Sequence, residues 1–130
     1  MARLGQLYLK GGVIDRRRIV SRTWIQESLE PGASFYPWGP ISDHGYGYQW
    51  WLGLMDGYEL FFAAGIGGQY ILCFPELNMI VVTTANMWSW EFQDDQLREI
   101  RDLVAEYVLP AVSGSIHGAD ALGCKRATKR

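Results

Sequence analysis

The part of this sequence best suited to chemistry is a glycine-rich run between two apolar segments. The run reads Ala63-Ala64-Gly65-Ile66-Gly67-Gly68. Glycine allows another group to approach the backbone closely, so Gly65, Gly67 and Gly68 could cradle a substrate carbonyl beside Ile66. The alternative is that these glycines only permit a bulge or a close approach between two strands. The run does not fit a nucleotide-binding loop, because no helix is expected to follow it.

The histidines and cysteines add no second centre of chemistry. His44 could act as a base, but it has no paired carboxylate or nucleophile motif, and a surface position is the simpler interpretation. Asp43, His44 and His117 lack the spacing of metal ligands, so we expect no metal and no cofactor. Cys73 lies in an apolar run and is predicted to be a buried free thiol. We expect no disulfide between it and Cys124, which lies in a polar segment.

Four clustered aromatic residues, Tyr46, Tyr48, Trp50 and Trp51, could line a substrate cleft. Alternation along a strand would place the first three on one face and Trp51 on the other. At least part of the set should therefore belong to the core. Cleft and core are equally consistent with the pattern.

Two N-terminal segments have helical character. A helix over residues 2–9 is predicted by apolar residues at helical spacing, and Gly11-Gly12 should end it. Met1 offers no side-chain acceptor as a cap, which suggests a chain that has been cut. Ser21 is a good cap for a second helix over residues 22–29. The side chains expected on one side of that helix are those of Trp24, Ile25 and Ser28.

Strand-like runs occupy the middle of the chain, after a loop over residues 30–44. Pro75 to Asn78 has the residue types of a hairpin turn between the last two runs. These two runs are apolar on both alternating faces, which indicates a sheet covered by helices on each side. The predicted strands are Gly45–Leu52, Tyr58–Ala64, Gly68–Phe74 and Met79–Thr84.

A last helix is predicted over residues 94–109, ended by Pro110. Its apolar positions recur at helical spacing, and its charged positions fall mostly on the opposite side. The apolar positions are Leu97, Ile100, Val104 and Val108, and the charged ones are Arg98, Glu99, Arg101, Asp102 and Glu106. Residues 111–130 have no periodicity and are predicted to form a mobile tail.

Composition places the chain among ordinary globular domains. Of its 130 residues, 48% are hydrophobic and 14% aromatic, and the formal net charge is −2. This balance gives no electrostatic reason to expect nucleic acid or anionic lipid as a partner. No apolar run reaches the ~18–20 residues of a membrane span. The sequence by itself does not indicate a cellular compartment.

Two stretches, GYGYQWWLG from Gly45 to Gly53 and FFAAGIGGQYILCFPELNMIVVTTAN from Phe61 to Asn86, resemble the superfamily of serine β-lactamases and penicillin-binding proteins. Within it, the chain is most similar to the branch of class C enzymes, esterases and nylon-oligomer hydrolases. The resemblance covers roughly residues 1–110. It implies the C-terminal portion of a β-lactamase/transpeptidase-like fold, whose active site lies where an antiparallel sheet meets a helical region.

The resemblance also implies three catalytic motifs: Ser-x-x-Lys, Tyr-x-Asn or Tyr-x-Ser, and a Lys/His-Thr/Ser/Gly-Gly triplet. Of these, only the position of the third can be identified in this chain. The chain contains no Ser-x-x-Lys and no Tyr followed two residues later by Asn or Ser. Ala63-Ala64-Gly65 occupies the place of the Lys/His-Thr/Ser/Gly-Gly triplet. Ile66 matches the following position, whose backbone N–H stabilises the oxyanion in the family. Ala63, Ala64, Gly65 and Gly67 are the matching substrate-binding positions.

The sequence therefore predicts an α+β fold, an antiparallel sheet flanked by helices, with a β-lactamase-related domain over residues 1–110. Its expected function is that of a C-terminal fragment of a serine hydrolase that cleaves an ester, an amide or a β-lactam. A small ester or amide would be the substrate of the complete enzyme. The isolated chain should be inactive and should pair with a missing N-terminal half or self-associate. The alternatives are a non-catalytic binding module, using aromatic residues to hold a peptide or polysaccharide, and a truncated gene product.

Overall fold

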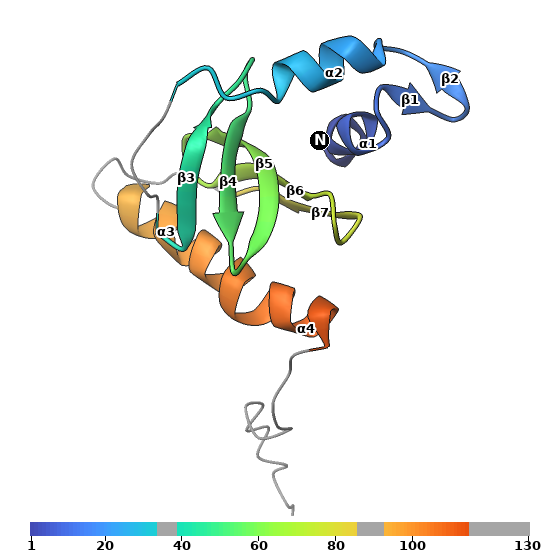
Figure 1. The fold of residues 1–130 in the computed structure, drawn as a ribbon. Helices are drawn as coiled ribbons and strands as arrows, with labels where there is room; N and C mark the ends of the chain where they lie inside the picture. Colours follow the sequence, from blue (N-terminus) through green and yellow to red (C-terminus); the bar gives the residue numbers. More distant parts are fainter. Residues whose placement is uncertain (34–38, 86–92, 115–130) are drawn as a thin grey trace, which may run out of the picture.

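A five-stranded antiparallel sheet forms the centre of the molecule in the computed structural model (Figure 1). The structure describes residues 1–33, 39–85 and 93–114, without the side chains of residues 43, 44 and 93–97. The strand order follows the sequence, β3-β4-β5-β6-β7. The strands are β3 (Ile41–Tyr46), β4 (Trp51–Met55), β5 (Tyr58–Gly65), β6 (Gln69–Phe74) and β7 (Met79–Thr83).

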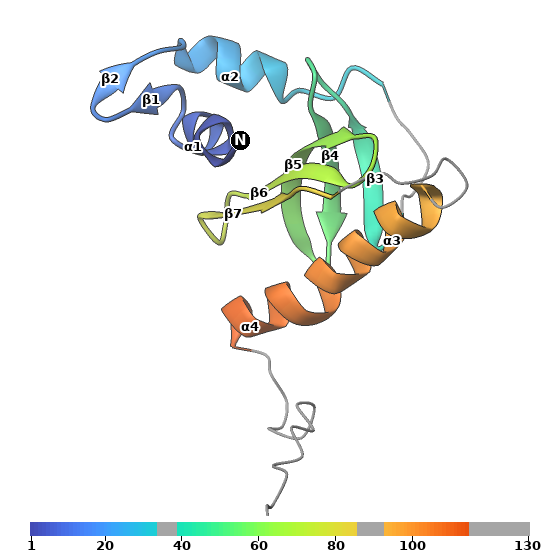
Figure 2. The same ribbon diagram turned by 180° about the vertical axis from the view of Figure 1, so that it is seen from behind.

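Helices cover both faces of this sheet, as Figures 1 and 2 show from opposite sides. The helices α1 (Ala2–Leu9) and α2 (Arg22–Ser28) lie on one side, joined by a small hairpin of β1 (Val13–Ile14) and β2 (Arg17–Arg18). A C-terminal helical rod crosses the other side. It consists of α3 (Gln93–Leu103), the π-helix η2 (Val104–Val108) and α4 (Leu109–Ser113). The predicted α+β class, with helices on an antiparallel sheet, is confirmed.

Each face of the sheet has its own apolar core. On the side of the C-terminal rod, Val104 and Leu109 are fully buried against strand residues such as Leu72 and Phe74. On the side of α1, a smaller cluster joins Trp50, Phe61, Ile71 and Cys73 with Tyr8 and Leu9 from the helix. Strand β6 contributes alternately to both clusters and is buried along nearly its whole length. The two-sided apolar pattern of the sequence therefore has the predicted cause.

The local signals at α2 and at the β6–β7 turn are confirmed. The Oγ atom of Ser21 accepts a hydrogen bond from the backbone N–H of Trp24 at 3.1 Å, as an N-cap should. The backbone N–H of Asn78 donates to the carbonyl of Pro75 at 3.0 Å, and Asn78 has a left-handed φ of 47°. The expected apolar side of α2 is only partly right. Ile25 and Ser28 are buried, whereas Trp24 is 47% exposed.

The predicted single strand Gly45–Leu52 is wrong, because the chain reverses within it. Tyr46 ends β3 and Trp51 begins β4, and the two residues pair across the hairpin. Between them Gln49 adopts a left-handed φ of 68°, and the N–H of Gly47 donates to the carbonyl of Trp50 at 2.8 Å. A side chain on Gly47 would collide with the carbonyl oxygen of Ser28, so the glycine marks a close approach of two backbones.

The predicted end of the last helix is also wrong. Pro110 does not stop it, because Pro110 lies in the first turn of α4, where a missing N–H is tolerated. The preceding turn is a π-helix, in which the N–H of Leu109 donates to the carbonyl of Val104 five residues before it. The helix ends at Gly114, whose φ is 72°. The first residues of the predicted tail are thus helical, and residues 115–130 lie outside the described structure.

Within the described ranges, no helix combines the length and the apolar character that a membrane span requires.

Candidate functional site

The glycine-rich run forms the tight turn between β5 and β6. Gly65, the last residue of β5, pairs with Gln69, the first of β6, so that Ile66, Gly67 and Gly68 make the connection. Gly67 and Gly68 have φ values of 79° and 82°, which non-glycine residues rarely adopt. The glycines are thus required by the turn itself. The backbone conformation of the turn therefore accounts for glycine at positions 67 and 68, whether or not the turn also binds a substrate.

Ile66 is the exposed residue of this turn. Its side chain is 61% exposed, and its backbone N–H has no hydrogen-bond partner among the described residues. Ala63 and Ala64 precede it on β5, where they pair with Ile71 and Tyr70 and pack on opposite faces of the sheet. The structure therefore brings the predicted site residues together at one end of one hairpin. Among them Gly65 and Ile66 are exposed, whereas Gly67 and Gly68 are buried.

Side chains of β6 and β7 that the sequence did not indicate hold the turn in place through hydrogen bonds. The Oγ1 atom of Thr83 donates to the carbonyl of Gly68 at 2.7 Å and accepts from the N–H of Tyr70 at 3.2 Å. The amide of Gln69 donates to the carbonyl of Ala85 at 2.6 Å. Gly68 also packs against helix α3, because a Cβ added to it would collide with Cδ1 of Ile100. These contacts fix the position of the turn relative to β7 and α3.

A buried arginine lies beneath the same hairpin. Arg101 of α3 is only 3% exposed, and its Nη1 donates to the hydroxyl of Tyr70 at 3.0 Å. The prediction that Arg101 belongs to the outer side of the helix is therefore wrong. Burial raises the pKa of Tyr70, and the nearby positive charge of Arg101 partly offsets that rise. The signal was present in the sequence, since Arg101 precedes Val104 by three residues and Val108 by seven.

The aromatic cluster belongs mainly to the core. Trp50 is buried against Tyr8 and Phe61, with ring centroids 4.6 and 5.0 Å away. Tyr46 and Trp51 contact each other edge to face at 4.6 Å, in the apolar environment of the other face. The expected grouping of Tyr46 with Trp50 is thus wrong, because the hairpin separates them.

Tyr48 is the exception among these aromatic residues. It is 57% exposed and contacts the half-exposed ring of Trp24 at 5.6 Å. These two rings form an aromatic patch at the surface.

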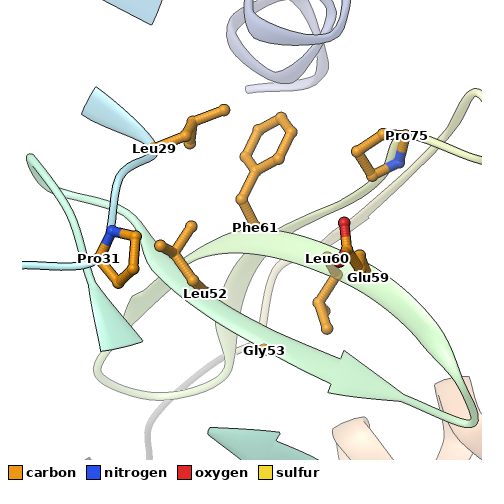
Figure 3. Close-up of a pocket in the computed structure, with 8 residues that line it drawn as sticks. All are labelled: Leu29, Pro31, Leu52, Gly53, Glu59, Leu60, Phe61 and Pro75. Carbon is orange, nitrogen blue, oxygen red and sulfur yellow. The ribbon is translucent and has the colours of Figure 1, made fainter. Parts of the chain in front are cut away.

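A pocket of about 280 Å³ lies over the beginning of β5, away from the glycine turn. Figure 3 shows Leu29, Leu52 and Phe61 pointing into it, with Pro31 and Pro75 at its sides. The remaining residues that line it are Gly53, Glu59 and Leu60. Its walls are apolar, and Glu59 is the one charged group among them. The pocket includes none of the predicted site residues.

Other candidate groups offer little reactivity. His44 lies on β3 rather than in the predicted loop, beside a register shift between Asp43 and Gly45, and its side chain is outside the described part. Cys73 is fully buried and free, and burial raises the pKa of its thiol to about 12, so it is not a nucleophile at neutral pH. Across the described ranges no group of His, Cys, Asp and Glu side chains could hold a metal ion. His117 and Cys124 lie outside these ranges.

Comparison with known proteins identifies no family for this chain. No protein-family model matches the chain, and no curated protein matches it.

Proposed function

We propose that this chain is the C-terminal part of a serine hydrolase related to β-lactamases and penicillin-binding proteins. In the complete enzyme it would supply the N–H of Ile66 as an oxyanion donor for acyl transfer from an ester or amide to water. The observation that carries the proposal is the N–H of Ile66, which has no partner among the described residues and lies at an exposed turn directly after Ala63-Ala64-Gly65 on an inner strand. A lactam substrate is less favoured, because Ala63 stands where the family has Lys or His.

The chemistry of an oxyanion donor suits this position. A donor must be free in the resting protein and must be held in place before charge develops on the carbonyl oxygen. The turn carrying Ile66 meets the second requirement, because Thr83 binds the carbonyl of Gly68 and Ile100 packs against the same glycine. A turn held in this way, with an N–H that no described residue binds, supports the proposed role whatever side chain residue 66 carries.

The nucleophile must come from another part of the complete enzyme. The sequence contains no Ser-x-x-Lys, and the thiol of Cys73 is buried. We therefore expect no turnover of activated esters or of a chromogenic lactam by the isolated chain, and no stoichiometric labelling by a fluorophosphonate. Turnover accompanied by labelling of one serine would show that the chain holds its own nucleophile.

The decisive experiment uses the complete reading frame. An in-frame Ser-x-x-Lys region encoded upstream is expected, and the protein expressed with it should hydrolyse activated esters. Ile66→Pro removes the donor and should lower kcat by roughly 10²–10³-fold. Ile66→Val keeps the N–H and should leave kcat nearly unchanged. Equal losses from the two variants would instead assign residue 66 a packing role.

The exposed ring pair of Trp24 and Tyr48 favours a second candidate, a non-catalytic module that binds a peptide or polysaccharide. Exposed aromatic rings supply large contact areas with little loss of conformational freedom. Titration of the chain with oligosaccharides and peptides, followed by tryptophan fluorescence, tests this alternative. Saturable binding that Trp24→Ala abolishes would support it, and the absence of any binding would remove it.

A further inference from the structure

The formal net charge of −2 conceals a segregation of charge along the chain. Of the twelve basic residues, six lie in the first 22 positions, together with one of the fourteen acidic residues. These positions form α1, the β1–β2 hairpin and the start of α2, which we call the basic unit (Figure 1). Its basic residues are Arg3, Lys10, Arg16, Arg17, Arg18 and Arg22. The basic unit therefore carries an excess of positive charge, although the whole chain is slightly acidic.

An open hollow of about 440 Å³ lies in this unit, between the end of α1 and the first turns of α2. None of the described residues that line it is acidic, and each polar side chain among them carries a hydrogen-bond donor. These polar residues are Tyr8, Lys10, Arg22 and Gln26. A hollow with two cations, further donors and no carboxylate is suited to an anion.

The cations at this hollow have no acidic partner among the described residues. Arg22 makes no hydrogen bond and no ion pair with them. The Nζ atom of Lys10 donates to Oδ1 of Asn78 at 3.0 Å, and this acceptor is neutral. The acidic residue of the basic unit, Asp15, is bound by Arg3 at 2.6 Å. An anion could therefore bind at the hollow without first displacing a carboxylate.

A further arginine holds the turn that carries Lys10. The Nη1 atom of Arg18 donates to the carbonyls of Gly11 and Val20 at 2.9 and 3.1 Å. Arg22 lies close to the same glycine, since a Cβ added to Gly11 would be 3.8 Å from its Nε atom. Arg18 thus fixes the backbone between the two lining cations and adds its own positive charge beside them.

We propose that this hollow binds the phosphate group of a small phosphate monoester through Lys10 and Arg22. A guanidinium can bind two phosphate oxygens at once, and an ammonium adds a compact positive charge. A phosphate monoester carries about −1.5 to −2 charges at neutral pH, so it complements two cations better than a carboxylate does. The volume lies within the ~300–1,000 Å³ of small-molecule pockets, and Leu9 and Ile25 offer apolar contacts to the organic group.

The inference does not depend on the proposed hydrolase function, because the two sites lie apart. Lys10 reaches Asn78 in the turn that follows β6, whereas the glycine turn precedes β6. The hollow and the glycine turn therefore lie toward opposite ends of that strand. Loss of either function would leave the other testable.

Titration of the unmodified chain with phenyl phosphate tests the proposal. Calorimetry should show saturable binding with a Kd of ~1 mM or tighter, and high salt should weaken it. Benzoate should bind more weakly and phenol not at all. The largest amide shifts in NMR spectra should fall in residues 8–12 and 22–26. The absence of saturable binding, equal affinity for benzoate, or largest shifts elsewhere in the chain would overturn the proposal.

Arg22→Gln and Arg17→Gln form a matched pair of variants. Both remove one positive charge from the basic unit at an exposed position, but Arg17 is not among the residues that line the hollow. Arg22→Gln should weaken binding about tenfold or more, which corresponds to ~1.4 kcal/mol or more. Arg17→Gln should weaken it less than about twofold, because solvent and salt screen a charge outside the site.

Equal losses in the two variants would mean that diffuse charge attracts the ligand, and would overturn the assignment of a site. Arg22 has no partner among the described residues, so its replacement should leave the fold intact. Circular dichroism checks this. If either variant is unfolded, the amide shifts of the unmodified chain decide.

The same phosphate chemistry also occurs in lipid headgroups, and vesicles distinguish the two sources. Phosphatidylcholine vesicles containing phosphatidic acid, which is itself a phosphate monoester, are compared with vesicles of phosphatidylcholine alone. Binding of phenyl phosphate in free solution, with equal sedimentation on the two kinds of vesicle, would support a small-molecule site. Sedimentation on the phosphatidic acid vesicles without binding of phenyl phosphate would overturn it.

Discussion

The guanidinium of Arg101 and the hydroxyl of Tyr70 form a buried hydrogen bond of 3.0 Å that joins helix α3 to the inner strand β6. Tyr70 is fully buried and Arg101 is only 3% exposed. A charged group so far from solvent requires polar partners, since an unpaired one would cost several kcal/mol. The pair therefore fixes the position of the C-terminal rod on the sheet, next to the hairpin that carries the glycine turn.

Removing the hydroxyl of this pair should destabilise the fold. We expect Tyr70→Phe to lower the free energy of unfolding by roughly 1.5–3 kcal/mol, because the hydrogen bond involves a charged donor and leaves it less well satisfied. Tyr58→Phe is the matched control, since Tyr58 packs against the same core and has no side-chain hydrogen bond among the described residues. Urea denaturation measures both. Equal effects would mean that the Arg101 contact contributes nothing.

Gly68 should tolerate a side chain much less well than Gly57, although both have a φ of +82°. A Cβ on Gly57 would have no atom within 4 Å, so Gly57→Ala reports backbone strain alone, about 1–2 kcal/mol. Gly68→Ala adds a collision with Ile100 and should cost a further ~1–3 kcal/mol. Chemical denaturation gives the difference, and Ile100→Ala should reduce it. A difference near zero would show that α3 does not press on the turn.

The sequence predicted elements whose cause is local. Ser21 caps α2 because its hydroxyl reaches an N–H three residues on, and Pro75 to Asn78 turn because Asn78 tolerates a left-handed backbone. The apolar patterns of β5 and β6 likewise follow from burial on two faces. Such signals depend on a few neighbouring residues, so they can be read without the fold.

The errors arose where distant residues decide the conformation. The reversal between Tyr46 and Trp51 depends on the close approach of Gly47 to Ser28, which the strand-like composition conceals. The helical spacing places Arg101 on the apolar side, but the partner that makes burial of its charge possible, Tyr70, lies 31 positions earlier and could not be identified from neighbouring residues. For the candidate site, the sequence indicated the glycine turn and Ile66, and the structure added the supporting contact of Thr83, which has no local signal.

The thiol of Cys73 should make the protein sensitive to alkaline pH. Burial raises its pKa from 9.0 to about 12, so the folded state keeps a proton that the unfolded state loses. The stabilisation is complete below pH 9.0, and the free energy of unfolding should fall by ~1.4 kcal/mol per pH unit from there toward pH 12. Cys73→Ala should remove this part of the slope and keep the part due to Tyr70, whose pKa is also raised by burial. Denaturation curves between pH 8 and 11 give both slopes, and unchanged slopes would contradict the assignment.

Helix α1 contacts the sheet through a glycine, and this contact gives the last prediction. A Cβ on Gly5 would lie 2.9 Å from Sγ of Cys73 and 3.1 Å from Cγ2 of Ile80. Gly5→Ala should therefore destabilise the fold by about 1–3 kcal/mol through overpacking, even though alanine is intrinsically better than glycine in a helix by ~1 kcal/mol. Gln6→Ala, at an exposed position of the same helix, should change stability by less than ~0.5 kcal/mol.

Gly5 and Cys73 should also be energetically coupled. Cys73→Ala removes the sulfur that the new methyl group would meet, so the double variant should be more stable than the sum of the single effects by roughly 0.5–3 kcal/mol. The rescue should be partial, because Ile80 and Ile71 remain within 3.2 Å of the added Cβ. Denaturation of the four proteins of this cycle measures the coupling. Strict additivity would mean that α1 moves away from the sheet to accommodate the methyl group, and hydrogen exchange in residues 2–9 would then become faster in Gly5→Ala.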